Sequence, residues 1–135
     1  MKVHSTNYAN TLILVSPDCR ATEASIPERP GTIAAMQYEM IAAAPYALTS
    51  DDVIFSVYAE RKAIPASERE TARTQFFSRG QACMRTSPLV RSYGWGVHHD
   101  GAGRMALVAV ESPEYAALAA SPEITKVNGM RSRRA

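Results

Sequence analysis

The apolar positions of the chain fall into segments whose spacing changes from strand-like to helical and back to strand-like. The first segment, Thr11–Val15, is β-favouring and stops at Ser16-Pro17, which predicts a short buried strand. Residues 16–31 carry three prolines and a glycine, so regular structure is not expected there. A loop of this length is uncommon in a compact domain unless it has a role, and we expect it to cover a site.

Helical spacing begins at Thr32, where an apolar stripe predicts a first helix that Pro45 ends. A second helix is predicted from Ser50, which can cap it, and the two aspartates that follow suit the positive helix start. A third helix is predicted from a capping box at 67–70, and Gly80 can close it. The inner faces of the first two helices are expected to carry Ile33, Met36, Met40, Ile41, Val53, Ile54, Val57 and Tyr58.

The clearest β pattern is a hairpin over residues 95–110. Its arms, 95–99 and 104–110, flank the glycine-bearing turn 100–103. The second arm is apolar on both faces, which predicts a central strand covered by helices on one side. Short helices with a serine cap and a proline at the first position are predicted at Ser87-Pro88, Ser112-Pro113 and Ser121-Pro122.

These elements predict an α+β fold in a single domain over residues 1–135. A small, mostly antiparallel sheet that includes the hairpin 95–110 would carry several helices packed mainly on one face. The length of 135 residues suits one ordinary domain, and 46% hydrophobic with 21% charged residues is typical of globular proteins.

The chain shows no sign of a membrane or secreted protein. It has no run of about eighteen apolar residues, and its first residues lack a long apolar segment. Cys19 and Cys83 lie far apart and make no disulfide framework. We therefore expect a soluble, cytoplasmic protein with no membrane partner, and we leave open whether it forms a homo-oligomer.

Charge is distributed unevenly along the chain. Residues 1–60 carry a net charge of −4, residues 61–104 carry +5, and the remainder, with a short basic tail at 130–135, carries +1. One interpretation is a non-catalytic module that binds nucleic acid or an acidic protein through 61–104 and the tail. No nucleic-acid-binding motif supports it, and the other interpretation is that the acidic and basic parts face each other.

Several segments match the sequence pattern of a known protein family: Gln37–Ile41, Thr49–Val53, Val57–Lys62, Phe76–Gln81, Tyr93–His98 and Met130–Ala135. Through them the chain resembles an uncharacterised family of short microbial proteins, a domain of unknown function, over nearly its whole length. The proline that this family usually has after Gly80-Gln81 is Ala82 here. The resemblance implies a single domain and brings no activity, cofactor or catalytic residue.

Common catalytic motifs are missing from the sequence. It has no glycine-rich phosphate loop, no His-Glu-x-x-His, no Cys-x-x-Cys and no Gly-x-Ser-x-Gly. His98 and His99 are neighbours in a predicted strand, so they point to opposite faces and cannot readily share one metal ion. We predict neither a cofactor nor a metal site.

Cys83 is a candidate nucleophile. It lies between Arg79 and Arg85, and nearby cations lower the pKa of a thiol and favour the reactive thiolate. If the chain folds back so that His98 meets Cys83, the two would form a nucleophile–base pair. The alternatives are an inert buried thiol and a disulfide with Cys19.

The segment after Cys83 offers groups that could bind a ligand. Tyr93 and Trp95 present flat faces among glycines that allow close approach, although Trp95 could equally anchor the core. Arg85 and Arg91 could clamp a carboxylate or phosphate.

Our best hypothesis is a cytosolic domain that binds a small anionic molecule beneath the loop 16–31. The binding residues would be Arg85, Arg91, Tyr93, Trp95, His99 and Cys19. If the protein is an enzyme, which the sequence leaves undecided, Cys83 would be the nucleophile and His98 the base.

Overall fold

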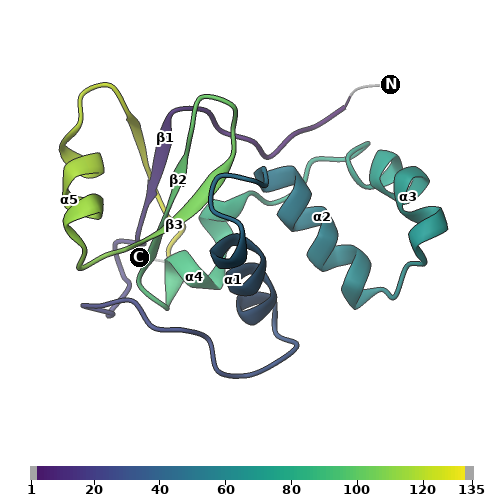
Figure 1. Cartoon of the computed structure of the whole chain (residues 1–135), viewed down its shortest axis with the longest axis horizontal. Coiled ribbons are helices and arrows are strands. Elements are labelled where there is room, and N and C mark those ends of the chain that lie inside the picture. The colour runs from purple at the N-terminus through teal and green to yellow at the C-terminus, as the bar shows by residue number, and fades with distance from the viewer. Residues whose placement is uncertain (1–2, 133–135) are drawn as a thin grey trace.

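Residues 3–132 are described by a computed structural model, and they contain five α-helices and a four-stranded mixed sheet (Figure 1). The predicted α+β fold class is confirmed. In chain order the elements are β1 (Thr11–Leu14), α1 (Ile33–Ala43), α2 (Ser50–Arg61), α3 (Arg69–Phe76), α4 (Pro88–Arg91), β2 (Trp95–His99), β3 (Met105–Ala109), α5 (Pro113–Ala120) and β4 (Thr125–Asn128). In the described part of the chain, no helix has both the length and the apolar character that crossing a membrane would require.

The strand order is β3-β2-β1-β4, and the helices cover the two faces of this sheet unequally. Register places Ile13 opposite Val97 and Val97 opposite Leu107, so these side chains share one face. Figure 1 shows α1, α4 and, farther out, α2 and α3 on one side of the sheet, and α5 alone on the other. The main core on the helix-rich side includes Ile13, Ile41, Val53, Met84, Val90, Val97 and Met105.

Side-chain caps fix where most of the helices begin. Ser87 and Ser112 accept a hydrogen bond from the first turns of α4 and α5, each with proline at the start, as predicted. Thr49, rather than Ser50, caps α2, because Asp52 completes a reciprocal capping box with it. Ser50 is instead buried, with its Oγ 2.8 Å from the Oγ of Thr6.

Three local predictions are wrong. The capping box at 67–70 does not form, because a 3₁₀ turn at 66–68 leads into α3 and Glu68 makes no capping bond. The segment after Ser121 is a turn into β4, because residues 125–128 pair in parallel with β1. The strand β3 lies at the sheet edge, and it is apolar on both faces because α5 covers one face and the main core covers the other.

The close contact between β2 and α5 depends on a glycine. A Cβ atom at Gly96 would lie 2.7 Å from Cε2 of Tyr115 and 3.1 Å from the carbonyl oxygen of Ile13. The phenol of Tyr115 accepts a hydrogen bond of 3.0 Å from the backbone N–H of Val15, so this ring has little freedom to move.

We therefore expect Gly96→Ala to lower the free energy of unfolding by about 1–3 kcal/mol, the usual cost of overpacking. Gly101→Ala is the matched control, because its nearest neighbour would be Oδ1 of Asn10 at an ordinary 3.5 Å. Urea denaturation of both variants measures the effect. Equal stability of the two variants would contradict the close packing of α5 on β2.

Candidate functional site

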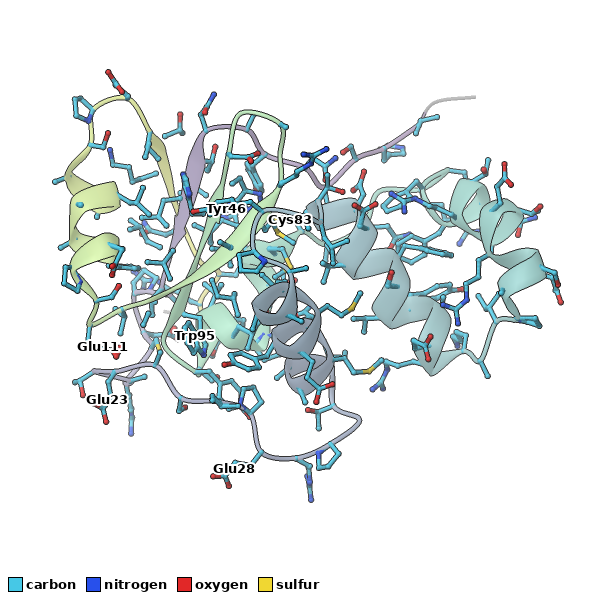
Figure 2. The ribbon with its side chains drawn as sticks, viewed as in Figure 1. Glu23, Glu28, Tyr46, Cys83, Trp95 and Glu111 are labelled. Carbon is cyan, nitrogen blue, oxygen red and sulfur yellow. The ribbon has the colours of Figure 1, made fainter. Side chains whose placement is uncertain are left out.

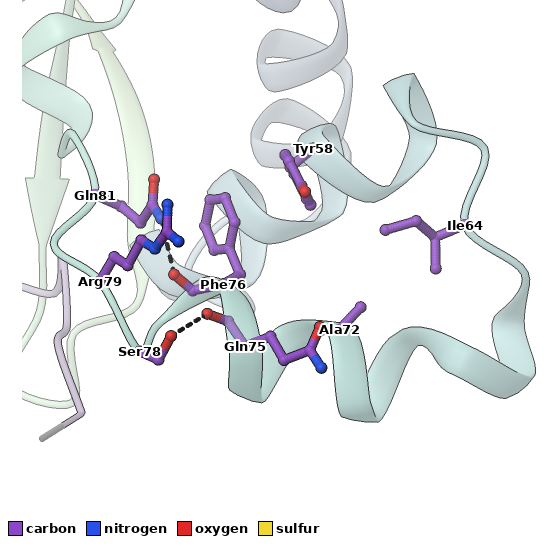
Figure 3. Close-up of a pocket in the computed structure, with 8 residues that line it drawn as sticks. All are labelled: Tyr58, Ile64, Ala72, Gln75, Phe76, Ser78, Arg79 and Gln81. Carbon is purple, nitrogen blue, oxygen red and sulfur yellow. Dashed lines mark hydrogen bonds between the residues drawn. The ribbon is translucent and has the colours of Figure 1, made fainter. Parts of the chain in front are cut away.

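Two adjoining cavities lie where α2, α3 and the segment 78–83 meet, and we call them together the helical groove. Their volumes are about 700 and 330 Å³, and both are lined by Tyr58, Phe76 and Gln81. Figure 3 shows the larger one, which Ile64, Ala72, Gln75, Ser78 and Arg79 complete. The smaller one also has Ile33, Gln37, Ile54, Val57, Arg61, Lys62, Ala82, Cys83 and Thr86 in its lining.

An aromatic cluster separate from the main core builds the wall of this groove. Phe55 and Ala59 of α2 pack with Phe77 just after α3. The ring of Phe76 lies 4.5 Å from that of Tyr58 and meets Phe55 edge-on at 5.7 Å, measured between centroids. Aromatic pairs of this kind contribute about 0.5–1.5 kcal/mol each beyond the area they bury. The wall is therefore held in place by packing.

Two ion pairs also fasten α3 to α2. Arg69 lies 2.9 Å from Glu60, and Arg73 lies 3.0 Å from Asp52. The same Asp52 caps α2, and although its partial burial acts to raise the pKa, the hydrogen bonds from Thr49 and Arg73 lower it overall. Each pair joins a cation of the basic stretch 61–104 to an acid of the first sixty residues, so the two parts of the chain meet at these two contacts.

The charge inside the helical groove has one sign. Arg61, Lys62 and Arg79 line it, whereas no aspartate or glutamate of the described residues does so. Gln81 donates a hydrogen bond of 2.8 Å to the carbonyl oxygen of Phe76, which fixes the segment after α3 against that helix (Figure 3). The groove thus combines aromatic walls with cationic groups.

Cys83 lines the smaller cavity, on the helix-rich side of the sheet. Its sulfur lies 3.3 Å from the phenol oxygen of Tyr8, and the Tyr8 ring packs edge-on against His99 at 5.4 Å. Burial, followed by the contact with Cys83, raises the pKa of the Tyr8 phenol, so this group is protonated at neutral pH. Cys19 and Cys83 are both free thiols, which excludes the disulfide alternative in this structure.

The predicted pair of Cys83 and His98 does not form. His98 lies opposite Leu12 and Ala106, on the α5 side of the sheet, and its Nδ1 lies 2.8 Å from the phenol oxygen of Tyr46. Cys83 belongs to the other side, because its partner Tyr8 packs on His99. The alternation of β2 therefore separates the two groups.

His99, a predicted ligand-binding residue, is fully buried at 0% exposure and cannot reach a ligand from the surface. Neither of its ring nitrogens has a hydrogen-bond partner in the described part of the chain. Burial lowers the pKa of His99 to about 4, with a smaller contribution from His98. The ring is therefore a neutral core side chain.

The loop 16–31 does not cover Cys83. Instead, the indole N–H of Trp95 donates a 2.8 Å bond to the carbonyl of Ser25, whose N–H donates to the carbonyl of Tyr93. A Cβ atom at Gly94, whose φ is +79°, would lie 2.9 Å from the carbonyl oxygen of Glu23. The protein's own loop therefore packs against Tyr93, Gly94 and Trp95. Figure 2 shows Trp95 well apart from Cys83.

The remaining predicted residues also lie outside the helical groove. Arg85 donates from Nε to the carbonyl of Asn128 at 2.6 Å. Arg91 lines a different cavity of about 630 Å³ that Asp18 and Arg20 share. Cys19 lies near Tyr115. Arg133 and Arg134 of the predicted basic tail lie outside the described residues.

Sequence reasoning missed the aromatic part of the groove. Tyr58 was predicted on the buried face of α2, yet it is 37% exposed and stacks on Phe76. No local periodicity could have shown this contact, since it depends on how α3 folds back on α2. Within residues 3–132, no cluster of three or more metal-ligating side chains occurs.

Comparison with known proteins gives one match. A family described as a family of unknown function (DUF6157) matches residues 3–135. No curated protein and no solved structure matches the chain.

The unpartnered ring of His99 makes a testable contribution to stability. The pKa of His99 is about 4 in the folded state, whereas 6.5 is its ordinary value, so the unfolded state binds a proton first as the pH falls. The contribution of His99 to stability is therefore fully present above pH ~6.5 and is lost as the pH falls towards ~4. We expect the wild type to lose about 3 kcal/mol between pH ~7 and pH ~4 through this group. Urea denaturation across that pH range measures the loss.

His99→Leu should remove this part of the pH dependence, with stability at neutral pH unchanged or raised by about 1 kcal/mol, since no hydrogen bond is lost. The partly exposed His4 provides the control variant His4→Leu, which should keep the acid loss. An identical pH profile for wild type and His99→Leu would show that His99 is not buried as described.

Proposed function

The chain belongs to a family of unknown function, DUF6157, and we propose that it binds a small anionic molecule with an apolar or aromatic body in the helical groove. The observation that carries this proposal is the one-sided charge of the groove. Arg61, Lys62 and Arg79 line its two cavities, and no carboxylate of residues 3–132 does. A small ligand site is typically an apolar cavity with a few polar groups that fix orientation.

Different side chains of the groove would contact different parts of the ligand. The ring faces of Tyr58 and Phe76 would contact the body of the ligand. Arg79 makes no hydrogen bond or ion pair among the described residues, so its guanidinium is free to bind a carboxylate, sulfonate or phosphate with two parallel hydrogen bonds. Arg61 has only a 3.4 Å contact with the carbonyl of Gly31.

The proposal is one of binding rather than of catalysis. Cys83 contributes to the wall of the smaller cavity, but its hydrogen-bond partner in the described chain is Tyr8, not a histidine. A phenol with a raised pKa stays protonated at neutral pH and is a poor base for a thiol. The groove therefore offers recognition without an evident nucleophile–base pair.

The alternative, a polyanion-binding surface on the basic stretch 61–104, has less support. Arg69 and Arg73 are engaged by Glu60 and Asp52, which reduces the charge available to an external polyanion. The groove cations, by contrast, have no acidic partner among the described residues.

We expect the anionic aromatic dye anilinonaphthalene sulfonate to bind the protein saturably, with one dye per chain. Arg79→Gln and Arg61→Gln should each weaken binding by about fivefold, the equivalent of roughly 1 kcal/mol for a partly exposed charged contact. Phe76→Leu should weaken binding as well, because it removes the flat face beside Tyr58. Dye fluorescence titrations measure these affinities.

The controls separate charge from apolar attraction. Arg104→Gln, directly after the hairpin turn and outside the groove, should leave the affinity unchanged. The uncharged analogue phenylnaphthylamine should bind more weakly than the dye and should not respond to Arg79→Gln. Dye affinity that is equal in all variants, or binding that does not saturate, would rule out the groove as an anion site.

A further inference from the structure

Tyr46 has a backbone conformation that an aromatic residue rarely adopts. Its φ is +57°, in the left-handed region, and such a conformation costs on the order of 1–3 kcal/mol, so it persists only where the surroundings impose it. Here the backbone imposes it, because Tyr46 N–H donates to Met105 O at 2.8 Å and Met105 N–H donates to Leu48 O at 2.9 Å. The segment thus pairs with the edge of β3, and the Tyr46 ring reaches His98 on the α5 side of the sheet.

The two rings form a hydrogen-bonded pair. The Tyr46 oxygen lies 2.8 Å from Nδ1 of His98, and the rings meet edge-on with 5.6 Å between centroids. Burial lowers the pKa of His98 and raises that of Tyr46, so both are neutral at pH ~7. With the His98 proton on Nε2, the phenol donates to Nδ1 and its oxygen lone pairs stay available to a ligand.

A cavity of about 610 Å³ between β3 and α5 has Tyr46 in its lining. Its surface is mainly apolar, with Ala106, Val108 and Leu118 among the contributors. Glu114 also lines it and has no hydrogen-bond or ion-pair partner among the described residues. In the part of the chain that the structure describes, no lysine, arginine or histidine lines this cavity, so its charge is opposite to that of the helical groove.

We propose that the cavity between β3 and α5 binds a small primary amine with an apolar body. The ammonium group would donate to the carboxylate of Glu114 and to the Tyr46 oxygen, and the body would lie against Ala106, Val108 and Leu118. An ammonium has three donors and no acceptor, which matches a carboxylate and a phenol oxygen whose own proton is engaged. His98 acts as a positioning residue, because its Nδ1 accepts the hydrogen bond of the phenol and so orients the Tyr46 ring.

The test uses benzylamine, which is cationic at neutral pH, and the alanine methyl groups of the protein as reporters. Ala106, Ala109 and Ala117 line the cavity, whereas Ala72 lines the helical groove. In methyl-labelled protein we expect benzylamine to cause saturable NMR shifts at the first three methyls and none at Ala72. Glu114→Gln should weaken binding by about tenfold and Tyr46→Phe by about threefold, as charged and neutral contacts differ in strength.

Benzyl alcohol and benzoate are the matched ligands that lack the positive charge. Binding of either as tight as that of benzylamine, an affinity unchanged by Glu114→Gln, or shifts that do not saturate would each overturn the proposal. The Ala106 signal of free Tyr46→Phe reports whether the hairpin is intact. The result is independent of the helical groove, because dye binding is read by fluorescence, amine binding is read at the methyls of the cavity between β3 and α5, and the two respond to different variants.

Discussion

The two-residue period of β2 governs how the functional groups of this protein are distributed. Trp95, Val97 and His99 face the helix-rich side, whereas Gly96 and His98 face α5. Because the strand lies inside the sheet, its pleat assigns every group near it to one side or the other. The thiol of Cys83 and the imidazole of His98 therefore lie on opposite sides of the sheet.

Most local features of the fold were predictable because their causes are local. The hairpin 95–110 follows from apolar arms around a glycine-bearing turn, and the starts of α4 and α5 follow from Ser-Pro pairs. The strand β4 was missed because its four residues carry little apolar pattern and gain their structure from pairing with β1. Tertiary pairing overrides local preference in such a segment.

The candidate site was less predictable than the fold. The sequence hypothesis assigns most binding and catalytic roles to residues between Gly80 and His99, because reactive and aromatic side chains are dense in that segment. In the structure, however, Trp95 contacts the loop 16–31 and His99 fills the core. The groove instead depends on Tyr58 and Phe76, which meet through the docking of α3. Two cavities of opposite charge result, separated by the sheet.

The bond from Trp95 to Ser25 has a practical consequence for following the protein in solution. Trp95 is the only tryptophan of the chain, so its intrinsic fluorescence reports on one place, the contact between β2 and the loop 16–31. The indole lines neither the helical groove nor the cavity between β3 and α5. Its emission should therefore follow release of the loop without interference from a molecule in the groove. The native chain thereby contains its own spectroscopic label for the longest irregular segment of the fold.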